Sequence, residues 1–542
     1  MKKYELWGRN CRCREQHDVW TRLLYIARGI YFLLYTLILV LVVFFRNTMQ
    51  YVWNAENKIL QVPQWTLLII GAGIAAGGVL LYSKYRRRLS DWCQNRAEVI
   101  VATGTILLFF VQMYISSQIY FSPGWDAGLL VNFAQHMENG ELEEIMDDVS
   151  GYFSLAPNNI MLTIIFKQLM HFSRLTGIFT ENDSLMMLIT IQCLISSLTV
   201  YLVYRCILKA TQSHAAAFAG WWIAVFFVGL SAWMVFPYSD ATGMLFPIWS
   251  VSVYLLWERK YLHVKWMVMS AIAVSGYIIK PQTVIVFLAI LIVEILRWCR
   301  EKKRWRYRLL CVAAAFLATG SIYFACGKIM EGFKTEIGFD EEQSLGILHY
   351  MMLGLNEENA GMYSYHDVEY SLSFDDKEER DKANLSKIEE RLTQYGPLGL
   401  LKHWQRKMTA NYGDGTFGWG GQSGGFYMEI YPEKDLPLSS FLRDIYYSDG
   451  SYFGGYFTIR QVCWLGILLL MGGAAWRKGT DAKDNGIDVM IISVIGLTLF
   501  ELIFEGHAKY LYTYIPFFVM LSVIGLHTYY KIFMLGREER LR

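Results

Sequence analysis

The sequence VIVATGTILLFFVQMYISSQIYFSPGWDAGLL, at residues 99–130, joins a long apolar run to a turn that carries an acid. The run at 99–120 is long enough to cross a membrane as one helix, since a crossing takes roughly 17–25 residues. Pro123-Gly124 favours a turn directly after this run, and Asp126 follows the turn. The pattern predicts a membrane helix whose exit places a carboxylate at the membrane surface.

The composition of the whole chain is that of a polytopic membrane protein. Of its 542 residues, 54% are hydrophobic, 16% are aromatic and only 18% are charged. A soluble protein of this size carries more charge and fewer long apolar runs. The formal net charge of +2 gives no electrostatic reason to expect nucleic acid as a partner. We therefore expect an all-α fold embedded in membrane lipid.

Apolar runs that are long enough to cross the bilayer predict about twelve transmembrane helices. They lie at 23–45, 65–82, 99–120, 184–204, 214–236, 238–257, 264–279, 282–298, 308–327, 459–476, 488–505 and 508–529. The alternative is a thirteenth crossing at 159–177. Lys167, His171 and Arg174 recur there at helical spacing, which is typical of a helix lying in the membrane interface. An even count also keeps the basic loop 205–213 in the cytoplasm, so twelve is favoured.

Lysine and arginine predict the orientation of the chain, because basic loops stay in the cytoplasm. YRRR at 85–88 and REKKRWRYR at 300–308 are strong basic clusters, and both termini fall on the same side as these loops. We therefore expect a multi-pass plasma-membrane protein with cytoplasmic termini. The long loops 121–183 and 328–458 would face outward.

The predicted spans divide the chain into four segments. These are a two-helix extension with a cytoplasmic loop (1–98), a transmembrane core with an outer loop (99–327), an extracytoplasmic domain (328–458) and C-terminal transmembrane helices (459–542). We expect interfacial helices in the outer loop at 121–183. The extracytoplasmic domain is expected to be a small insertion of mixed structure. It would include a charged helix that ends at Gly396-Pro397 and a glycine-rich aromatic loop at 413–427.

The cysteines and glycines predict no disulfide framework and no nucleotide site. None of the nine cysteines lies in either long polar loop. Cys11 and Cys13 lack a second pair that would indicate zinc. No Walker or Rossmann glycine pattern is present, which argues against a nucleotide donor. No cofactor is predicted, although the acidic run at 138–148 leaves a divalent metal open.

Asp126 is the first candidate for chemistry. A carboxylate at a membrane surface can accept the proton of a hydroxyl that attacks a sugar held on a lipid phosphate. Trp125, its neighbour, is a residue type favoured at the interface. The alternatives are that Asp126 caps the helix that follows or is simply solvated.

Three short outer turns carry further ionisable residues. Tyr238 and Asp240 lie between the fifth and sixth predicted spans, and Lys280 lies between the seventh and eighth. The turn between the last two spans carries Glu505, His507, Lys509 and Tyr510. Ionisable groups at hydrocarbon depth are costly and are usually paired or functional. We therefore expect these turns to meet Asp126 at one outward-facing site.

Each of these residues also has a plainer interpretation. Lys280 can extend its ammonium to the interface, and Asp240 can cap a helix. Glu505 can pair with Lys509, four residues later. Trp419, in the aromatic loop, can stack on a sugar ring or pack within the loop.

Taken together, these motifs resemble the GT-C superfamily of integral-membrane glycosyltransferases. The branch is that of the protein-O-mannosyltransferases and of the aminoarabinose transferases that modify lipid A. The motifs are GWD at 124–126, YFSLAPNN at 152–159, PYSD at 237–240, IKP at 279–281 and EGHAKYLYTYIP at 505–516. The resemblance covers about 100–530.

The resemblance implies a polyprenyl- or dolichyl-phosphate-linked sugar donor that is used at the outer face, usually with inversion at the anomeric carbon. The acceptor would be an extracytoplasmic glycan, teichoic-type polymer, lipid or protein. Asp126 would be the general base. The carrier phosphate would be held by Lys280, Glu505, His507, Lys509 and Tyr510. The candidates for substrate binding would be Asp240, Tyr238, Trp125, Asn158 and Trp419.

The chain departs from this family in the first outer loop and in the last turn. Ala127 follows Asp126 where protein mannosyltransferases commonly carry Glu. His507 and Lys509 stand where Arg is common, and Lys binds phosphate as a point charge rather than bidentately. Two other functions stay open, a flippase or transporter of lipid-linked sugars and a polymerase of surface polysaccharide.

Overall fold

The computed structural model describes residues 19–46, 62–179, 184–257, 260–300, 305–419, 437–477 and 482–540. Throughout these ranges the regular elements are helices and none is a strand. They include α2 (Val19–Phe45), α3 (Gln64–Ile119), α4 (Trp125–Asn139), α5 (Met146–Leu155), α6 (Ile160–Thr176), α7 (Ser184–Thr211), α8 (His214–Ala224), α9 (Ser239–Thr242), α10 (Leu245–Leu256), α11 (Leu262–Ile279), α12 (Ile285–Arg300), α13 (Trp305–Glu336), α14 (Ile347–Gly354), α15 (Tyr365–Leu372), α16 (Lys377–Tyr412), α17 (Pro437–Tyr446), α18 (Phe453–Met471), α19 (Ala482–Ile503), α20 (Ala508–Tyr512) and α21 (Ile515–Arg540). The all-α prediction is confirmed for this part of the chain. In the insertion at 328–458, expected to be of mixed structure, the described regular elements are helices joined by turns, and residues 420–427 of the predicted aromatic loop lie outside the described residues.

Within the described ranges, ten helical segments are long and apolar enough to cross a membrane, or eleven if one bent pair counts as a span. The prediction of about twelve exceeds this number because 214–236 and 238–257 are not continuous helices. Helix α8 ends at Ala224 and passes into a π-helical turn, η6 (Val225–Gly229), and α10 has only 12 residues. Pro237, which lacks a backbone N–H, stands between the two broken segments. Counted as ten, the spans fall short of twelve by a pair, and a missing pair leaves the expected sides of the other loops unchanged.

The bent pair lies in the first outer loop. Residues Leu142–Leu155 and Pro157–Thr176 meet at 105°. This bend is that of a broken or re-entrant segment rather than of one straight crossing. The basic face predicted on α6 also has a partner, since His171 and Arg174 both contact the Glu138 carboxylate of α4.

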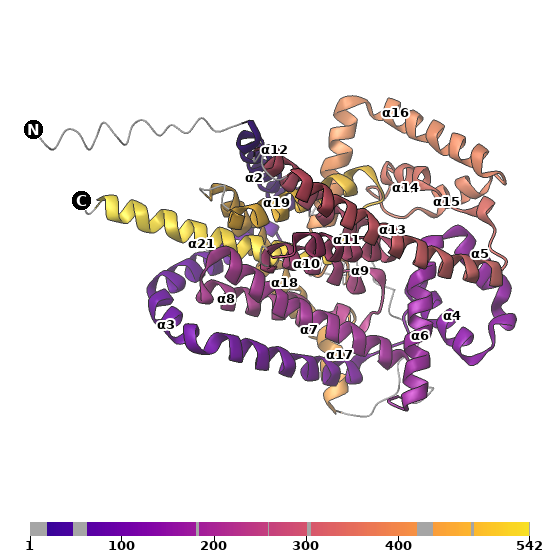
Figure 1. The fold of residues 1–542 in the computed structure, drawn as a ribbon, viewed down its shortest axis with the longest axis horizontal. Helices are drawn as coiled ribbons and strands as arrows, with labels where there is room; N and C mark the ends of the chain where they lie inside the picture. The colour runs from indigo at the N-terminus through magenta and orange to yellow at the C-terminus, as the bar shows by residue number, and fades with distance from the viewer. Residues whose placement is uncertain are drawn as a thin grey trace, which may run out of the picture.

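Helix α3 corrects the predicted loop at 83–98. It runs unbroken for 56 residues and contains two membrane-length apolar segments, Gln64–Tyr85 and Arg96–Ile119. No Gly or Pro interrupts 83–98, so nothing in that stretch ends a helix. Figure 1 shows α3 curving back on itself between the two segments, so they form a hairpin without a loop.

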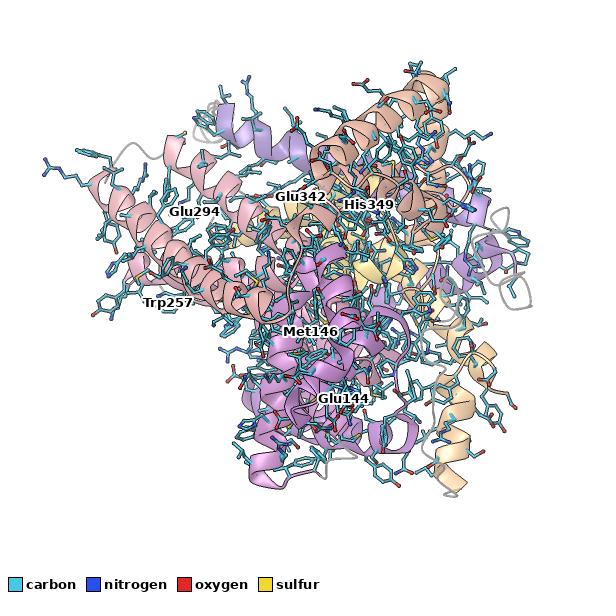
Figure 2. All side chains as sticks on the ribbon, turned by 90° about the vertical axis from the view of Figure 1, so that its right-hand side faces the viewer. Glu144, Met146, Trp257, Glu294, Glu342 and His349 are labelled. Carbon is cyan, nitrogen blue, oxygen red and sulfur yellow. The ribbon has the colours of Figure 1, made fainter. Side chains whose placement is uncertain are left out.

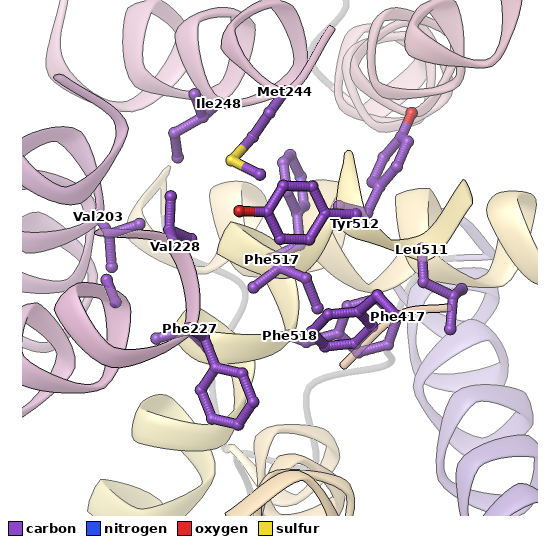
Figure 3. Close-up of a cluster of buried hydrophobic side chains, with 14 of the residues drawn as sticks. Val203, Phe227, Val228, Met244, Ile248, Phe417, Leu511, Tyr512, Phe517 and Phe518 are labelled. Atoms are coloured by element: carbon purple, nitrogen blue, oxygen red, sulfur yellow. The ribbon is translucent and has the colours of Figure 1, made fainter. Parts of the chain in front are cut away.

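The centre of the bundle is formed by α21, α18, α19 and α7, which are the most buried of the candidate spans, whereas α13 is the least buried. Figure 3 shows side chains from several of these elements meeting in one core, including Val203 of α7, Phe227 of η6 and Phe518 of α21. Phe417, from the end of the insertion, packs its ring 5.9 Å from that of Tyr512. The insertion is thereby fastened to the transmembrane core.

The two long polar segments lie at one end of the molecule. In Figure 1, α4, α5, α14 and α15 lie at the right, and the C-terminal end of α21 lies at the left. Figure 2 views the molecule from the right-hand end and shows Glu144 beside the start of α5 and His349 on α14. The outer loop and the insertion therefore meet on the same side of the bundle, as the charge pattern predicts.

Helix α16 carries the insertion back to the bundle. Gly396, with φ of 54° and ψ of −176°, breaks its helical geometry just before Pro397. A positive φ of this kind favours glycine. The predicted stop at this dipeptide is therefore a kink, after which the helix resumes and continues to Tyr412.

The first described helix, α2, is part of the bundle. Arg28 of α2 donates to both carboxylate oxygens of Asp488 on α19, at 2.6 and 3.0 Å, and both residues are buried. Tyr35, further along α2, donates to the Val494 backbone oxygen at 2.9 Å. These contacts fix α2 against a helix that lies more than 400 positions later in the chain.

Candidate functional site

A tight turn positions Asp126 at the start of α4. Gly124 is the N-cap, and Trp125 adopts a φ of 55°. A positive φ costs a residue with a side chain roughly 1 kcal/mol. Gly128 permits the turn, because a Cβ atom there would overlap the backbone oxygen of Pro123. Asp126 is therefore not the N-cap and lies in the first turn of α4.

Tyr238 connects the first outer loop to the second turn. Its hydroxyl donates to Oδ2 of Asp126 at 3.1 Å. The Tyr238 side chain is buried, whereas Asp126 is exposed. Burial raises the pKa of Tyr238, and the negative charge of Asp126 raises it further, so the phenol stays protonated and can donate. This bond holds one carboxylate oxygen while the side chain remains accessible.

Asp240 and Lys280 form a buried ion pair at the base of the site. Lys280 Nζ lies 2.5 Å from Oδ1 of Asp240, and the Asp240 side chain is fully buried. Burial lowers the pKa of Lys280, and the charge of Asp240 opposes that shift. Lys280 therefore points to a carboxylate rather than towards the interface. The N-cap of α9 is Tyr238 and not Asp240, whose Oδ2 has no hydrogen-bond partner among the described residues.

The third turn places Glu505, His507 and Lys509 beside these groups. His507 caps α20 by accepting from the Lys509 backbone N–H at 3.2 Å. The chain is not helical from Glu505 to His507, so Glu505 and Lys509 are not a pair on one helix. Burial raises the pKa of Glu505, an effect that Lys509 and a hydrogen bond from Tyr510 oppose.

Aromatic rings bring the three turns together. Lys280 Nζ lies 4.7 Å from the centre of the Tyr510 ring. Lys509 Nζ lies 5.8 Å from the Tyr238 ring and 5.7 Å from the Tyr510 ring. The residues joined in this way come from four separated parts of the chain. We call them the outer cluster, which consists of Asp126, Tyr238, Asp240, Lys280, Glu505, Lys509 and Tyr510.

The remaining predicted site residues lie around the outer cluster in different settings. Trp125 is exposed, with 58% of its surface accessible. Asn158 is exposed and donates to Oδ1 of Asn159 at 3.3 Å. Trp419 is buried, and its Nε1 donates to the Tyr446 backbone oxygen at 2.8 Å. Its ring packs against other aromatic rings and does not face solvent.

Comparison with known proteins settles the family. The model of a family described as a conserved hypothetical integral membrane protein matches residues 23–529. The chain belongs to this family. No curated protein and no solved structure matches it. The family establishes an integral membrane protein, in agreement with the multiple apolar helices.

Two tyrosines of this membrane protein belong to the site but do not stand out in the sequence. Tyr152, on α5, lies beside Asp126 and receives a 2.7 Å hydrogen bond from Asn159. Tyr350, on α14, accepts the Glu505 backbone N–H at 2.9 Å through its backbone oxygen. The chain holds 35 tyrosines, so no local pattern distinguishes these two.

Lys407 is a third residue that the sequence does not reveal. It is fully buried on α16, and its Nζ donates to the backbone oxygens of Gly354 at 2.8 Å and Phe504 at 2.6 Å. Burial lowers its pKa to about 7. In the sequence it is one of several cations on an amphipathic helix, which predicts an exposed position.

The described residues contain no group of three His, Cys, Asp or Glu side chains arranged to hold a metal ion. The acids of the outer cluster lie instead among lysines and tyrosines. This arrangement offers an accessible carboxylate, positive charge and phenolic donors within one site. Chemically, it can accept a proton at one position and stabilise an anion at another.

Proposed function

We propose that the protein is a glycosyltransferase that moves a sugar from a polyprenyl-phosphate-linked donor to an extracytoplasmic acceptor. One observation carries the proposal: an accessible acid, Asp126, and two lysines, Lys280 and Lys509, come from distant loops into one cluster at the end of the bundle. An integral membrane protein that only supported others would not need to gather an accessible acid and two lysines around a buried ion pair.

Asp126 is the general base in this proposal. The acceptor hydroxyl attacks the anomeric carbon as Asp126 takes its proton, and the bond from that carbon to the phosphate oxygen breaks. The bonding electrons leave with the phosphate of the lipid carrier. The hydrogen bond from Tyr238 orients the carboxylate. Attack from the side opposite the phosphate inverts the anomeric centre.

Lys509 is the better candidate to meet the leaving phosphate. Lys280 is already paired with Asp240, whereas none of the ion pairs among the described residues involves Lys509. Lys509 is half-buried, so its charge is screened less than that of a surface lysine. In this proposal Tyr510 and the Lys280–Asp240 pair line the side of the site that the phosphate contacts. Positive charge placed at the leaving group lowers the barrier to its departure.

The test compares Asp126→Asn with Asp147→Asn, an exposed acid in the same outer loop. Lipid-linked sugars and surface glycans are measured by mass spectrometry in cells that carry each variant. We expect Asp126→Asn to accumulate one polyprenyl-phosphate sugar and to lose its product, while Asp147→Asn resembles the wild type. Full product formation by Asp126→Asn would remove this residue from the mechanism.

A flippase of lipid-linked sugars is the second candidate, because α8, η6, α9 and α10 form broken segments. Broken helices near a binding site are common in transporters. Proteoliposomes separate the two functions. A transferase consumes a donor supplied on the side of the outer cluster without moving it, whereas a flippase moves the donor and forms no product. A polymerase of surface polysaccharide would share the donor and would differ in adding repeated units.

A further inference from the structure

A second polar site lies at the other end of α4 from Asp126. A cavity of about 270 Å³ opens between the C-terminal ends of α4 and α6 and the start of α7. It is lined by Gln135, Glu138, Asn139, Met170, Ser173, Arg174, Phe179 and Ser184. We call it the α4–α6 pocket. None of these residues takes part in the outer cluster.

Ser173 shows that the pocket has an unmet hydrogen-bonding group. The residue is 2% exposed, and within the described chain its Oγ has no hydrogen-bond partner. A buried hydroxyl without a partner is unfavourable, and native proteins rarely keep one without a reason. A hydroxyl or amide of a bound molecule would satisfy it.

The charges of the pocket are already compensated. Glu138 Oε1 lies 2.5 Å from Arg174 Nη2 and 3.0 Å from His171 Nδ1. The Glu138 side chain is only 8% exposed, whereas that of Arg174 is 42% exposed. A charged ligand would find the opposite charge of the pocket already engaged in this pair. The pocket is therefore suited to a neutral molecule.

The other lining groups are those that recognise polyhydroxylated rings. The amides of Gln135 and Asn139 and the hydroxyl of Ser184 can each donate and accept hydrogen bonds. Phe179 and the buried Met170 supply an apolar surface for the C–H face of a ring. A small-molecule site usually combines a mostly apolar wall with a small number of well-placed polar groups.

We propose that the α4–α6 pocket binds one neutral sugar unit of the acceptor. The inference rests on the proposed function and narrows its acceptor to a glycan. From Asp126 to Glu138, α4 rises about 18 Å, at 1.5 Å per residue. The bound unit is thus remote from the reacting hydroxyl, and the acceptor must be an oligosaccharide or polysaccharide that spans both sites.

The experiment measures sugar binding to the purified full-length protein in lipid nanodiscs by saturation-transfer NMR. The probes are glucose, galactose, rhamnose and N-acetylglucosamine, with glucuronate and inorganic phosphate as anions. Ser173→Leu fills the pocket, and Gln135→Ala removes one amide. Gln168→Ala, an exposed position on α6 outside the pocket, is the matched control.

We expect at least one neutral sugar to bind, with affinity reduced about tenfold in Gln135→Ala and lost in Ser173→Leu. Gln168→Ala and Asp126→Asn should bind as the wild type does. The inference is overturned if no neutral sugar binds, if Ser173→Leu and Gln135→Ala both bind normally, or if only the anions bind. Gln135→Ala keeps the test valid should Ser173→Leu fail to fold.

The two proposals can fail separately. If Asp126→Asn leaves transfer intact and a neutral sugar still binds in the pocket, the proposed role of Asp126 in transfer is wrong and the proposed sugar site is supported. If Asp126→Asn abolishes transfer and no pocket variant alters sugar binding, the mechanism stands and the pocket is not an acceptor site. In transfer assays, pocket variants should raise the KM for a polymeric acceptor and leave kcat unchanged.

Discussion

Lys407 Nζ lies 2.6 Å from the backbone oxygen of Phe504, the residue that precedes Glu505. The same atom also donates to the backbone oxygen of Gly354, at the end of α14. Lys407 therefore ties the insertion to the turn that supplies Glu505, His507 and Lys509 to the outer cluster. The insertion shapes the site through this buried ammonium.

The first prediction concerns pH. Burial lowers the pKa of Lys407 to about 7, while the nearby Glu501 and Glu505 act in the opposite direction. An unfolded lysine keeps its proton to about pH 10. Between these values the unfolded chain binds more protons, so the contribution of Lys407 to stability should rise with pH. We expect the Tm of the detergent-solubilised protein to show this rise.

The reference for that measurement is Lys407→Met, which has no proton to lose. The variant should lack the rise in Tm and should be less stable by roughly 1–3 kcal/mol, since it leaves backbone oxygens of Gly354 and Phe504 without a donor. Lys402→Met, at an exposed position on the same helix, controls for charge removal. If the Tm of Lys407→Met rises with pH as the Tm of the wild type does, the rise does not come from Lys407.

The second prediction concerns the buried pair of Asp240 and Lys280. Asp240→Asn or Lys280→Met alone should cost about 3–5 kcal/mol, because each leaves one buried charge uncompensated. The double variant should be more stable than either single one. Thermal unfolding of the four proteins forms a double-mutant cycle. Additive losses would mean that the two charges do not depend on one another.

The third prediction tests the bond between Tyr238 and Asp126. Tyr238→Phe keeps the ring that Lys509 contacts and removes only the donor to Asp126. If Asp126 is the base, transfer should slow by about tenfold, since a hydrogen bond to a charged group is worth roughly 1.5–3 kcal/mol and part of it is regained from water. Donor binding should not change. Tyr365→Phe, at an exposed tyrosine, should be neutral in both assays.

The fourth prediction uses two helical glycines. Gly128→Ala would force a Cβ atom against the Pro123 backbone oxygen and should move the turn that carries Asp126. Gly151→Ala has open space around it and is the control. We expect loss of transfer in Gly128→Ala, measured in single-turnover assays, and normal transfer in Gly151→Ala. Equal activity of both variants would show that the turn tolerates displacement.

The sequence is enough to predict the helical membrane fold and the meeting of the three outer turns with Asp126. Hydropathy fixes which segments lie in the bilayer, and short turns on one side of a bundle cannot lie far from each other. The sequence does not predict that Asp240 neutralises Lys280, because the pairing spans 40 positions and depends on how α9 and α11 pack. From the local sequence alone, Asp240 could equally well be a helix cap, and Lys280 could equally well extend its ammonium to the membrane interface.

Other features depend on packing and leave little trace in the sequence. The interruptions of 214–257 come from π and 3-10 turns at apolar residues, which hydropathy treats as one continuous signal. The continuity of α3 through its basic segment is readable in retrospect, since that segment has no Gly or Pro. The burial of Lys407 cannot be predicted from the sequence, because a lysine in an amphipathic helix is ordinarily solvated.

The buried contact between Arg28 and Asp488 bears on the order in which the chain is made. The ribosome synthesises Arg28 early, yet the carboxylate that neutralises it emerges only after some 460 further residues. During that interval the ion pair between Arg28 and Asp488 cannot form. A nascent chain that stops before Asp488 therefore lacks this contact between α2 and the C-terminal part of the bundle.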